Sequence, residues 1–169
     1  GPGVLLPLGK VIIAVYLGCA LHAVLTYGGL ILSLGKLNPV HFFRGMVDAQ
    51  LVAFSTASSA GTLPVNLRCT QRNLGVSESI SSFVLPLGAT LNMDGTAIYQ
   101  GVTTLFVAQA YGIELGMSQF LTIIFSATLA SIGTAGVPGA GMIMLSLVLG
   151  SVGLPIEGVA LVTGIDRIL

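Results

Sequence analysis

A long apolar run between two lysines is the feature that most limits how this chain can fold. Residues 11–34 contain no acidic side chain, no lysine and no arginine, and Lys10 and Lys36 bracket them. About 20 consecutive apolar residues cross the roughly 30 Å hydrocarbon core of a bilayer as a helix. The run therefore predicts a transmembrane helix over 11–34. His22 lies inside it, and packing against a neighbouring helix or a position at a bend explains a histidine there better than the alternative, a proton relay.

The scarcity of charge extends this interpretation to the whole chain. Of its 169 residues, 54% are hydrophobic and 7% are charged, whereas soluble domains average about 25% charged residues. So little charge cannot cover a water-facing surface, and we expect an all-α, multi-pass protein of the cell membrane. The net charge of zero gives no sign of a nucleic-acid partner. The chain has no initiator methionine and stops inside an apolar segment, so we expect a fragment of a longer protein.

The stretch 38–74 contains apolar arms on either side of a small, hydroxyl-rich segment. We call residues 55–64 the first tip; they read Ser-Thr-Ala-Ser-Ser-Ala-Gly-Thr-Leu-Pro. The arm after this tip is too short to cross a bilayer, which predicts a re-entrant hairpin. Non-helical backbone at membrane depth is tolerated where protein buries it or where it lines a cavity. Arg44 and Asp48 are four residues apart and are expected to pair on one helix face.

The stretch 115–152 repeats this pattern with a second tip, which we define as the glycine-rich residues 131–141. It predicts a second hairpin, and 158–169 is expected to begin the last transmembrane helix. With both hairpins re-entrant, four of the basic residues share one face of the membrane, which the positive-inside rule makes cytoplasmic; they are Lys36, Arg44, Arg68 and Arg72. The hairpins then enter from opposite sides. Inverted repeats with interrupted helices are typical of secondary transporters.

The stretch 79–111 carries Asp94 within an apolar run and is expected to be a transmembrane helix with an unwound centre, because Pro86, Gly88 and Gly95 weaken the helix there. An acid at the middle of a spanning helix costs about 2.5–3.5 kcal/mol, so a bound cation is a natural partner. On a regular helix Asn92 and Asp94 would face about 200° apart. Unwinding between Gly88 and Gly95 would free carbonyls and place them with Asp94, Asn92 and Thr90 as oxygen ligands for sodium. The alternative is that Asp94 faces a different partner.

The two tips indicate a different chemistry. Half-helices that end at a tip present unpaired N–H groups and the positive end of the helix dipole, which suit a carboxylate. Ser58 and Ser59 would add hydroxyl groups. Close helix packing by small residues is the alternative for either tip alone. A channel with two pore loops is a remote alternative for the pair, and an enzyme is disfavoured because no histidine or lysine lies near either tip.

At these residues the chain resembles a known family. The segments 58–64, 91–96 and 131–141 resemble the dicarboxylate/amino acid:cation symporters, the glutamate transporter homologues, and look most like their prokaryotic members. The resemblance covers essentially the whole chain. It implies the truncated transport domain of an elevator-type transporter that works as a homotrimer, with two oppositely oriented re-entrant hairpins. No cofactor is implied; the coupling ion would be sodium, with the proton as the alternative.

The resemblance also implies site residues by matching motifs. The implied substrate contacts are Ser58, Ser59, Met93, Thr96, Val137, Pro138, Gly139, Ala140 and Gly141. The implied sodium ligands form three sets, Gly88 with Asn92, Thr90 with Ser131, Ile132 and Thr134, and Asn92 with Asp94.

The implied function is sodium-coupled symport of acidic amino acids, glutamate or aspartate, or of related dicarboxylates. Proton-coupled symport of C4-dicarboxylates or of neutral amino acids is the alternative. Two departures bear on the substrate. Ala57 stands where some archaeal members have an arginine, and the family's segment for the substrate amino group would begin after Leu169.

Overall fold

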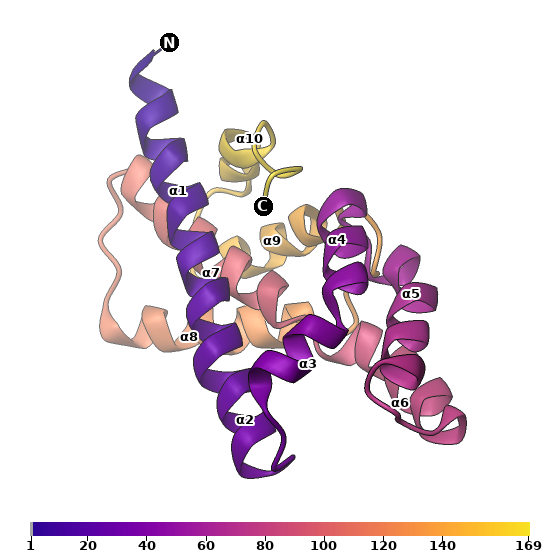
Figure 1. Cartoon of the computed structure of the whole chain (residues 1–169). Coiled ribbons are helices and arrows are strands. Elements are labelled where there is room, and N and C mark those ends of the chain that lie inside the picture. Colours follow the sequence, from indigo (N-terminus) through magenta and orange to yellow (C-terminus); the bar gives the residue numbers. More distant parts are fainter. Residues whose placement is uncertain (1) are drawn as a thin grey trace. The chain divides into compact units, whose positions relative to one another are not determined.

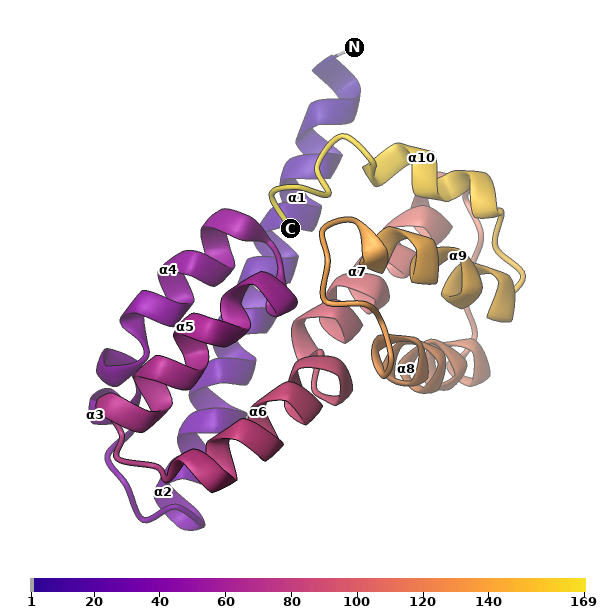
Figure 2. The same cartoon turned by 90° about the vertical axis from the view of Figure 1, so that its right-hand side faces the viewer.

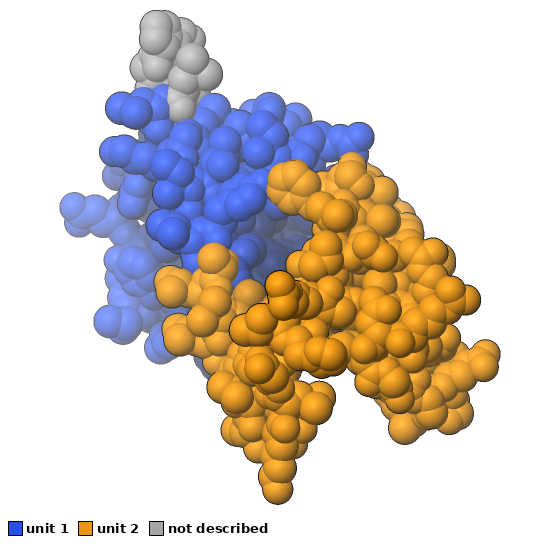
Figure 3. Space-filling model, viewed as in Figure 1, with its two compact units in different colours: residues 1–19, 93–134, 139–169 blue, residues 20–92, 135–138 orange. Residues whose placement is uncertain are grey.

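The computed structural model describes the backbone of residues 2–169 and the side chains from Leu6 onward. This part of the chain contains helices, turns and loops and no strand (Figure 1). It divides into two compact units, coloured separately in Figure 3. Unit 1 comprises Gly1–Cys19, Met93–Thr134 and Gly139–Leu169, and unit 2 comprises Ala20–Asn92 and Ala135–Pro138.

The first helix is the long apolar one. It begins as α1 (Pro2–Leu21), passes through a π-helical segment η1 (His22–Tyr27) and ends as α2 (Gly28–Ser33). Its Leu6–Ser33 portion is, among the described residues, the one helix long and apolar enough to cross a membrane. It therefore starts earlier than the expected 11–34. The π-helical turns contain His22, whose Nδ1 lies 3.2 Å from Thr26 Oγ1.

Unit 2 continues with α3 (Pro39–Gly45), α4 (Val47–Thr56), α5 (Ser59–Arg72) and α6 (Glu78–Leu91). Asn38 caps α3 by accepting a hydrogen bond from the Val40 amide at 2.8 Å. Helices α4 and α5 lie side by side (Figure 2), and Gln71 of α5 donates to Ser81 of α6 at 2.8 Å. Helix α5 occupies most of the expected first tip, so only Ala57 and Ser58 interrupt the helical backbone there.

The expected pairing of Arg44 with Asp48 is wrong. The helix is interrupted at Met46, whose φ of −102° and ψ of 6° separate α3 from α4. Arg44 and Asp48 therefore do not share one regular helix face, and no ion pair joins them.

Unit 1 contains α7 (Asp94–Ala110), α8 (Met117–Ser131), α9 (Ala140–Ser151), η2 (Ile156–Gly158) and α10 (Val159–Val162). Its core joins α1, α7 and α9 through buried apolar side chains that include Val11, Val15, Val107, Leu145 and Leu149. A second cluster packs α8 against α9 through Ile123, Ala127, Ala130 and Val148.

The last segment differs from the expected helix over 158–169. Helix α10 covers only Val159–Val162, and turns follow from Thr163 to Ile168. The amides of Ile165 and Ile168 bond to carbonyls three residues earlier, at 3.0 and 2.9 Å. These hydrogen bonds span three residues, as in a 3₁₀-helix, whereas those of an α-helix span four. The Tyr16 hydroxyl donates to the Ile168 carbonyl at 2.6 Å, which ties this segment to α1.

Candidate functional site

The two tips meet within unit 2. Ser58 is the N-cap of α5, and its hydroxyl oxygen accepts a hydrogen bond from the Gly61 amide at 3.0 Å. The same hydroxyl donates to the carbonyl oxygen of Gly136 at 2.7 Å. The Ala60 amide donates to that carbonyl at 3.0 Å. The Gly136 carbonyl thus lies at the N-terminal end of α5, where free N–H groups and the helix dipole favour an oxygen with negative charge.

Two backbone features shape this contact. Ala57 has the left-handed conformation, with a φ of 48°, which turns the chain between α4 and α5. A Cβ atom at Gly136 would lie 3.0 Å from both the Ala60 nitrogen and Ser59 Cβ, so glycine permits the close approach. Sequence reasoning did not single out Gly136, although the glycine-rich composition of the second tip was the available signal.

The helix break around Asp94 falls at two residues. Helix α6 ends at Leu91 and α7 begins at Asp94, and the ψ values of Asn92 and Met93 are 68° and 60°. This position lies within the 88–95 stretch for which the sequence favoured unwinding. Asp94 occupies the first turn of α7, where its carboxylate interacts favourably with the helix dipole.

Gly88 and Asn92, which were predicted to share one sodium site, are neighbours in unit 2. The backbone N–H of Asn92 donates to the Gly88 carbonyl at 3.0 Å in the last turn of α6. A Cβ atom at Gly88 would lie 3.5 Å from Asn92 Nδ2, so the asparagine side chain runs beside this glycine. Thr90 donates its hydroxyl hydrogen to the Leu87 carbonyl at 3.0 Å, which leaves the oxygen lone pairs of Thr90 available as acceptors.

Ser131, Ile132 and Thr134 lie together at the C-terminal end of α8 in unit 1. Ser131 and Thr134 are buried, and their hydroxyls donate to Thr128 O at 2.8 Å and Ala130 O at 2.6 Å. Ile132 already has extended backbone. A helix C-terminus carries unpaired carbonyls and the negative end of the dipole, both of which favour a cation.

Part of the implied substrate set also lies within unit 1. A Cβ atom at Gly141, in the first turn of α9, would lie 3.7 Å from Thr96 Cγ2. Met93 is buried and directly precedes α7. Gly139 has a φ of 82°, a value that glycine adopts readily, and it leads the second tip into α9. Ala140 follows Gly139 in unit 1, whereas Pro138 and the exposed Val137 belong to unit 2.

The predicted sets are not all brought together. Asn92 ends one segment of unit 2, and Met93 and Asp94 begin a segment of unit 1. Thr90 and the α8 residues likewise belong to different units. The sodium sets that combine Asn92 with Asp94, and Thr90 with Ser131, Ile132 and Thr134, therefore stay predictions. Among the described residues, no group of three or more His, Cys, Asp or Glu side chains could hold a metal ion.

Two further features of unit 1 were missed by sequence reasoning. The Tyr99 hydroxyl donates to Asp166 Oδ1 at 3.3 Å. Gln100 and Thr103 are fully buried on α7, and Gln100 Oε1 and Thr103 Oγ1 have no hydrogen-bond partner.

A cavity of about 650 Å³ lies elsewhere in this unit and is lined by residues that include Lys10, Phe106 and Gln109. None of the predicted site residues lines it.

Comparisons with known proteins bear on the whole chain. The family model described as "Sodium:dicarboxylate symporter family" matches residues 1–169. An "Excitatory amino acid transporter" of Caenorhabditis elegans is 43% identical over 162 residues, which are 96% of this chain and 32% of the relative. "Excitatory amino acid transporter 2" of Homo sapiens is 44% identical over 167 residues, which are 96% of this chain and 28% of the relative.

A third relative, "Excitatory amino acid transporter 3" of Homo sapiens, is 44% identical over 162 residues, which are 96% of this chain and 31% of the relative. The chain spans about three tenths of the length of the curated relatives it matches. These relatives are animal transporters, and the expectation of a prokaryotic type stays a prediction. Because the family model matches the chain from end to end, the chain belongs to the sodium:dicarboxylate symporter family.

Proposed function

We propose that the protein containing this chain is a secondary active transporter of the cell membrane. It couples inward movement of sodium to uptake of an acidic amino acid, glutamate or aspartate, or of a related dicarboxylate. The family's description supports sodium and a dicarboxylate, and the names of the relatives support an acidic amino acid. On this proposal the chain is part of the moving transport domain of an elevator-type homotrimer, and α4–α5 and α8–α9 are its two re-entrant hairpins.

The observation that carries the proposal is the meeting of the two tips at Ser58 and Gly136. The Gly136 carbonyl accepts hydrogen bonds from the Ser58 hydroxyl and the Ala60 amide. A substrate carboxylate oxygen could accept hydrogen bonds from the same two donors. The positive end of the α5 dipole would attract its negative charge as well. Withdrawal of the second tip would free these donors for the substrate. We assign the substrate to Ser58, Ser59, Met93, Thr96 and residues 137–141.

The coupling ion would bind to oxygen atoms around the interrupted helix. Asp94 supplies a carboxylate, Asn92 and Thr90 supply an amide and a hydroxyl oxygen, and the C-terminal end of α8 supplies carbonyls. Hard cations prefer such ligands to nitrogen or sulfur. We therefore assign sodium to the three sets implied by the motifs. An ion in the set of Asn92 with Asp94 would also offset the cost of holding the Asp94 charge at membrane depth.

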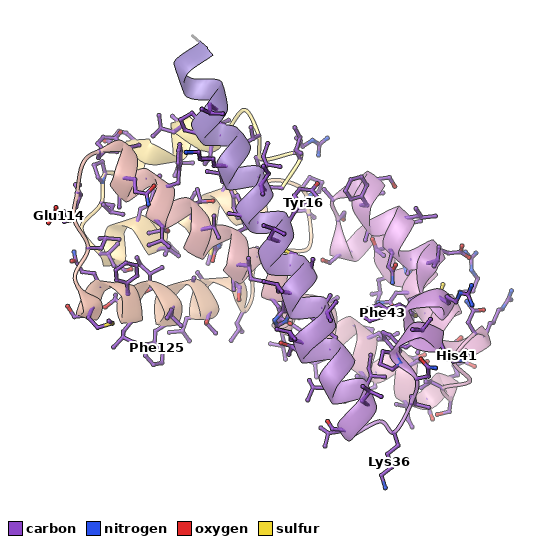
Figure 4. The ribbon with its side chains drawn as sticks, turned by 60° about the vertical axis from the view of Figure 1, so that its left-hand side comes forward. Tyr16, Lys36, His41, Phe43, Glu114 and Phe125 are labelled. Carbon is purple, nitrogen blue, oxygen red and sulfur yellow. The ribbon has the colours of Figure 1, made fainter. Side chains whose placement is uncertain are left out.

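Exposed apolar faces support membrane placement. Leu121, Phe125 and Leu129 follow one another at four-residue spacing on α8, and they are 51%, 68% and 69% exposed. Figure 4 shows Phe125 pointing away from the ribbon. A contiguous apolar face of this kind favours lipid or protein contact over water.

The test uses the full-length protein in proteoliposomes with an imposed sodium gradient. Asp94→Asn removes the carboxylate charge and should strongly weaken sodium-dependent uptake of glutamate or aspartate. Asp48→Asn is the matched control, because Asp48 is exposed on α4 outside every predicted ligand set. Unchanged uptake and unchanged sodium dependence in Asp94→Asn would show that the assignment of Asp94 is wrong. Uptake driven by a pH gradient without sodium would instead favour the proton-coupled alternative.

A further inference from the structure

The charges of this chain are divided unevenly between its two units. Unit 1 contains Lys10 and Arg167 with four acidic residues, whereas unit 2 contains four basic residues with Asp48 and Glu78. We call these four basic residues the basic cluster; they are Lys36, Arg44, Arg68 and Arg72. All four are exposed. Unit 2 therefore carries a net positive charge, and that charge is available at its surface.

The arginines of the cluster lie at the C-terminal ends of α3 and α5, which a hydrogen bond connects. Arg44 lies in the last turn of α3 and Arg72 in the last turn of α5. Asn73 Nδ2 donates to the Gly45 carbonyl at 2.6 Å, so the residues next to these two arginines are hydrogen-bonded to each other. Arg68 precedes Arg72 by four residues and shares its face of α5.

Lys36 lies three residues beyond the long apolar helix that ends at Ser33. Figure 4 shows its side chain pointing away from the ribbon. The neighbouring Leu34, Leu37 and Val40 are 79%, 56% and 63% exposed. Basic side chains beside exposed apolar ones are the pattern of a segment that sits at a membrane surface, with apolar groups among the acyl chains and cations among the headgroups.

No side chain of the basic cluster has an ion-pair or hydrogen-bond partner within the described part of the chain. Asp48 lies beyond the break at Met46 and Glu78 begins α6, and neither pairs with the cluster. Arginine binds phosphate groups in a bidentate manner, and clusters of four or more basic residues next to a transmembrane helix attract anionic lipids. The cluster therefore presents uncompensated positive charge at the surface of unit 2.

We propose that the basic cluster binds the anionic phospholipid headgroups of the leaflet that it faces. The proposal rests on the membrane placement given under the proposed function, and it is independent of the substrate and of the coupling ion. It makes the lipid composition of that leaflet a determinant of how α3 and the end of α5 are held at the membrane surface.

The experiment measures lipid retention by the full-length protein without substrate or sodium. The protein is released from nanodiscs that contain equal amounts of phosphatidylglycerol and phosphatidylcholine, and native mass spectrometry counts the lipids that stay bound. The test variant combines Arg44→Gln, Arg68→Gln and Arg72→Gln. The matched control combines Lys10→Gln and Arg167→Gln, which remove exposed charges from unit 1. A third variant replaces the three arginines by lysine and keeps the charge.

The wild type and the control should retain phosphatidylglycerol in preference to phosphatidylcholine. The glutamine variant should lose this preference, by about fivefold in association constant for each arginine removed. The lysine variant should keep most of it. Equal melting temperatures would show that all variants are folded.

Equal retention of phosphatidylglycerol by the wild type and the glutamine variant would overturn the proposal. So would a wild type with no preference between the two lipids, because another partner would then cover the cluster. Since neither measurement involves uptake, a failure here leaves the transporter proposal intact, and a failure of the Asp94→Asn test leaves the lipid proposal intact.

Discussion

Ser58 and Gly136 are separated by 78 positions in the chain, yet the Ser58 hydroxyl donates to the Gly136 carbonyl at 2.7 Å. The Ser58 oxygen accepts from the Gly61 amide at the same time, so it both caps α5 and holds the second tip. The Ala60 amide completes the contact at 3.0 Å. A single serine thus links the start of a helix to a loop that is distant in sequence.

A methyl group at Gly136 should loosen this contact. In Gly136→Ala, the new Cβ atom would lie 3.0 Å from the Ala60 nitrogen, which forces the second tip to shift. The loss of one backbone hydrogen bond costs about 1 kcal/mol, so the Ala60 amide should exchange with deuterium roughly fivefold faster. Hydrogen exchange of the full-length protein measures this. Gly150→Ala is the control, because a Cβ atom there meets nothing within 4 Å. Unchanged exchange at Ala60 would contradict the close contact.

The buried hydroxyl of Thr103 should lower the free energy of unfolding relative to a variant that lacks this hydroxyl. It has no hydrogen-bond partner, whereas the neighbouring Thr104 donates to the Gln100 carbonyl at 2.7 Å. Valine has the same shape without the hydroxyl. Thr103→Val should therefore raise the free energy of unfolding by about 1 kcal/mol, and Thr104→Val should lower it by about 1 kcal/mol. Chemical denaturation measures both, and a lower stability for Thr103→Val would indicate that the hydroxyl has a partner.

Gly158 allows η2 to pack closely on α7. A Cβ atom at this position would overlap with Val107 Cγ1, and Val107 is fully buried. Gly158→Ala should lower the free energy of unfolding by about 1–3 kcal/mol, because overpacking forces neighbouring groups to move. Gly164→Ala is the control, since a Cβ atom there has open space. Thermal unfolding of the two variants should give a clearly lower midpoint for Gly158→Ala, and equal midpoints would argue against this packing.

The hydrogen bond from Tyr99 to Asp166 should hold the turns that follow α10. Tyr99 is 6% exposed, and its hydroxyl lies 3.3 Å from Asp166 Oδ1. Tyr99→Phe keeps the ring and removes the bond, so amides in 163–168 should exchange faster with deuterium. Tyr111→Phe is the control, because Tyr111 is 44% exposed. An identical exchange pattern in both variants would show that the bond does not restrain the segment.

Local patterns along the chain were sufficient to predict much of the secondary structure. The uncharged run 11–34 matches the long apolar helix up to Ser33, and each tip contains a break between two helices. The glycines on either side of Asn92 and Asp94 indicated a break that the structure has at Asn92 and Met93. These features depend on composition and on residues within a few positions of one another, which sequence spacing describes directly. Family membership followed from the same motifs and agrees with the comparisons.

Contacts between distant segments were decided only by the tertiary structure. No local pattern relates the two residues in the hydrogen bond from Ser58 to Gly136, or in the one from Tyr99 to Asp166. No local pattern indicates the burial of Gln100 and Thr103 either. The expected pair of Arg44 and Asp48 failed for a related reason, since a break at Met46 changed the helix face on which the spacing argument relied. Sequence by itself determined which stretches are apolar and that the helices break at the two tips and near Asp94, but it did not determine the break at Met46 or the turns after α10. Which atoms meet across those interruptions depends on packing, because close approach of backbone to backbone is set by the whole fold and not by neighbours in the chain.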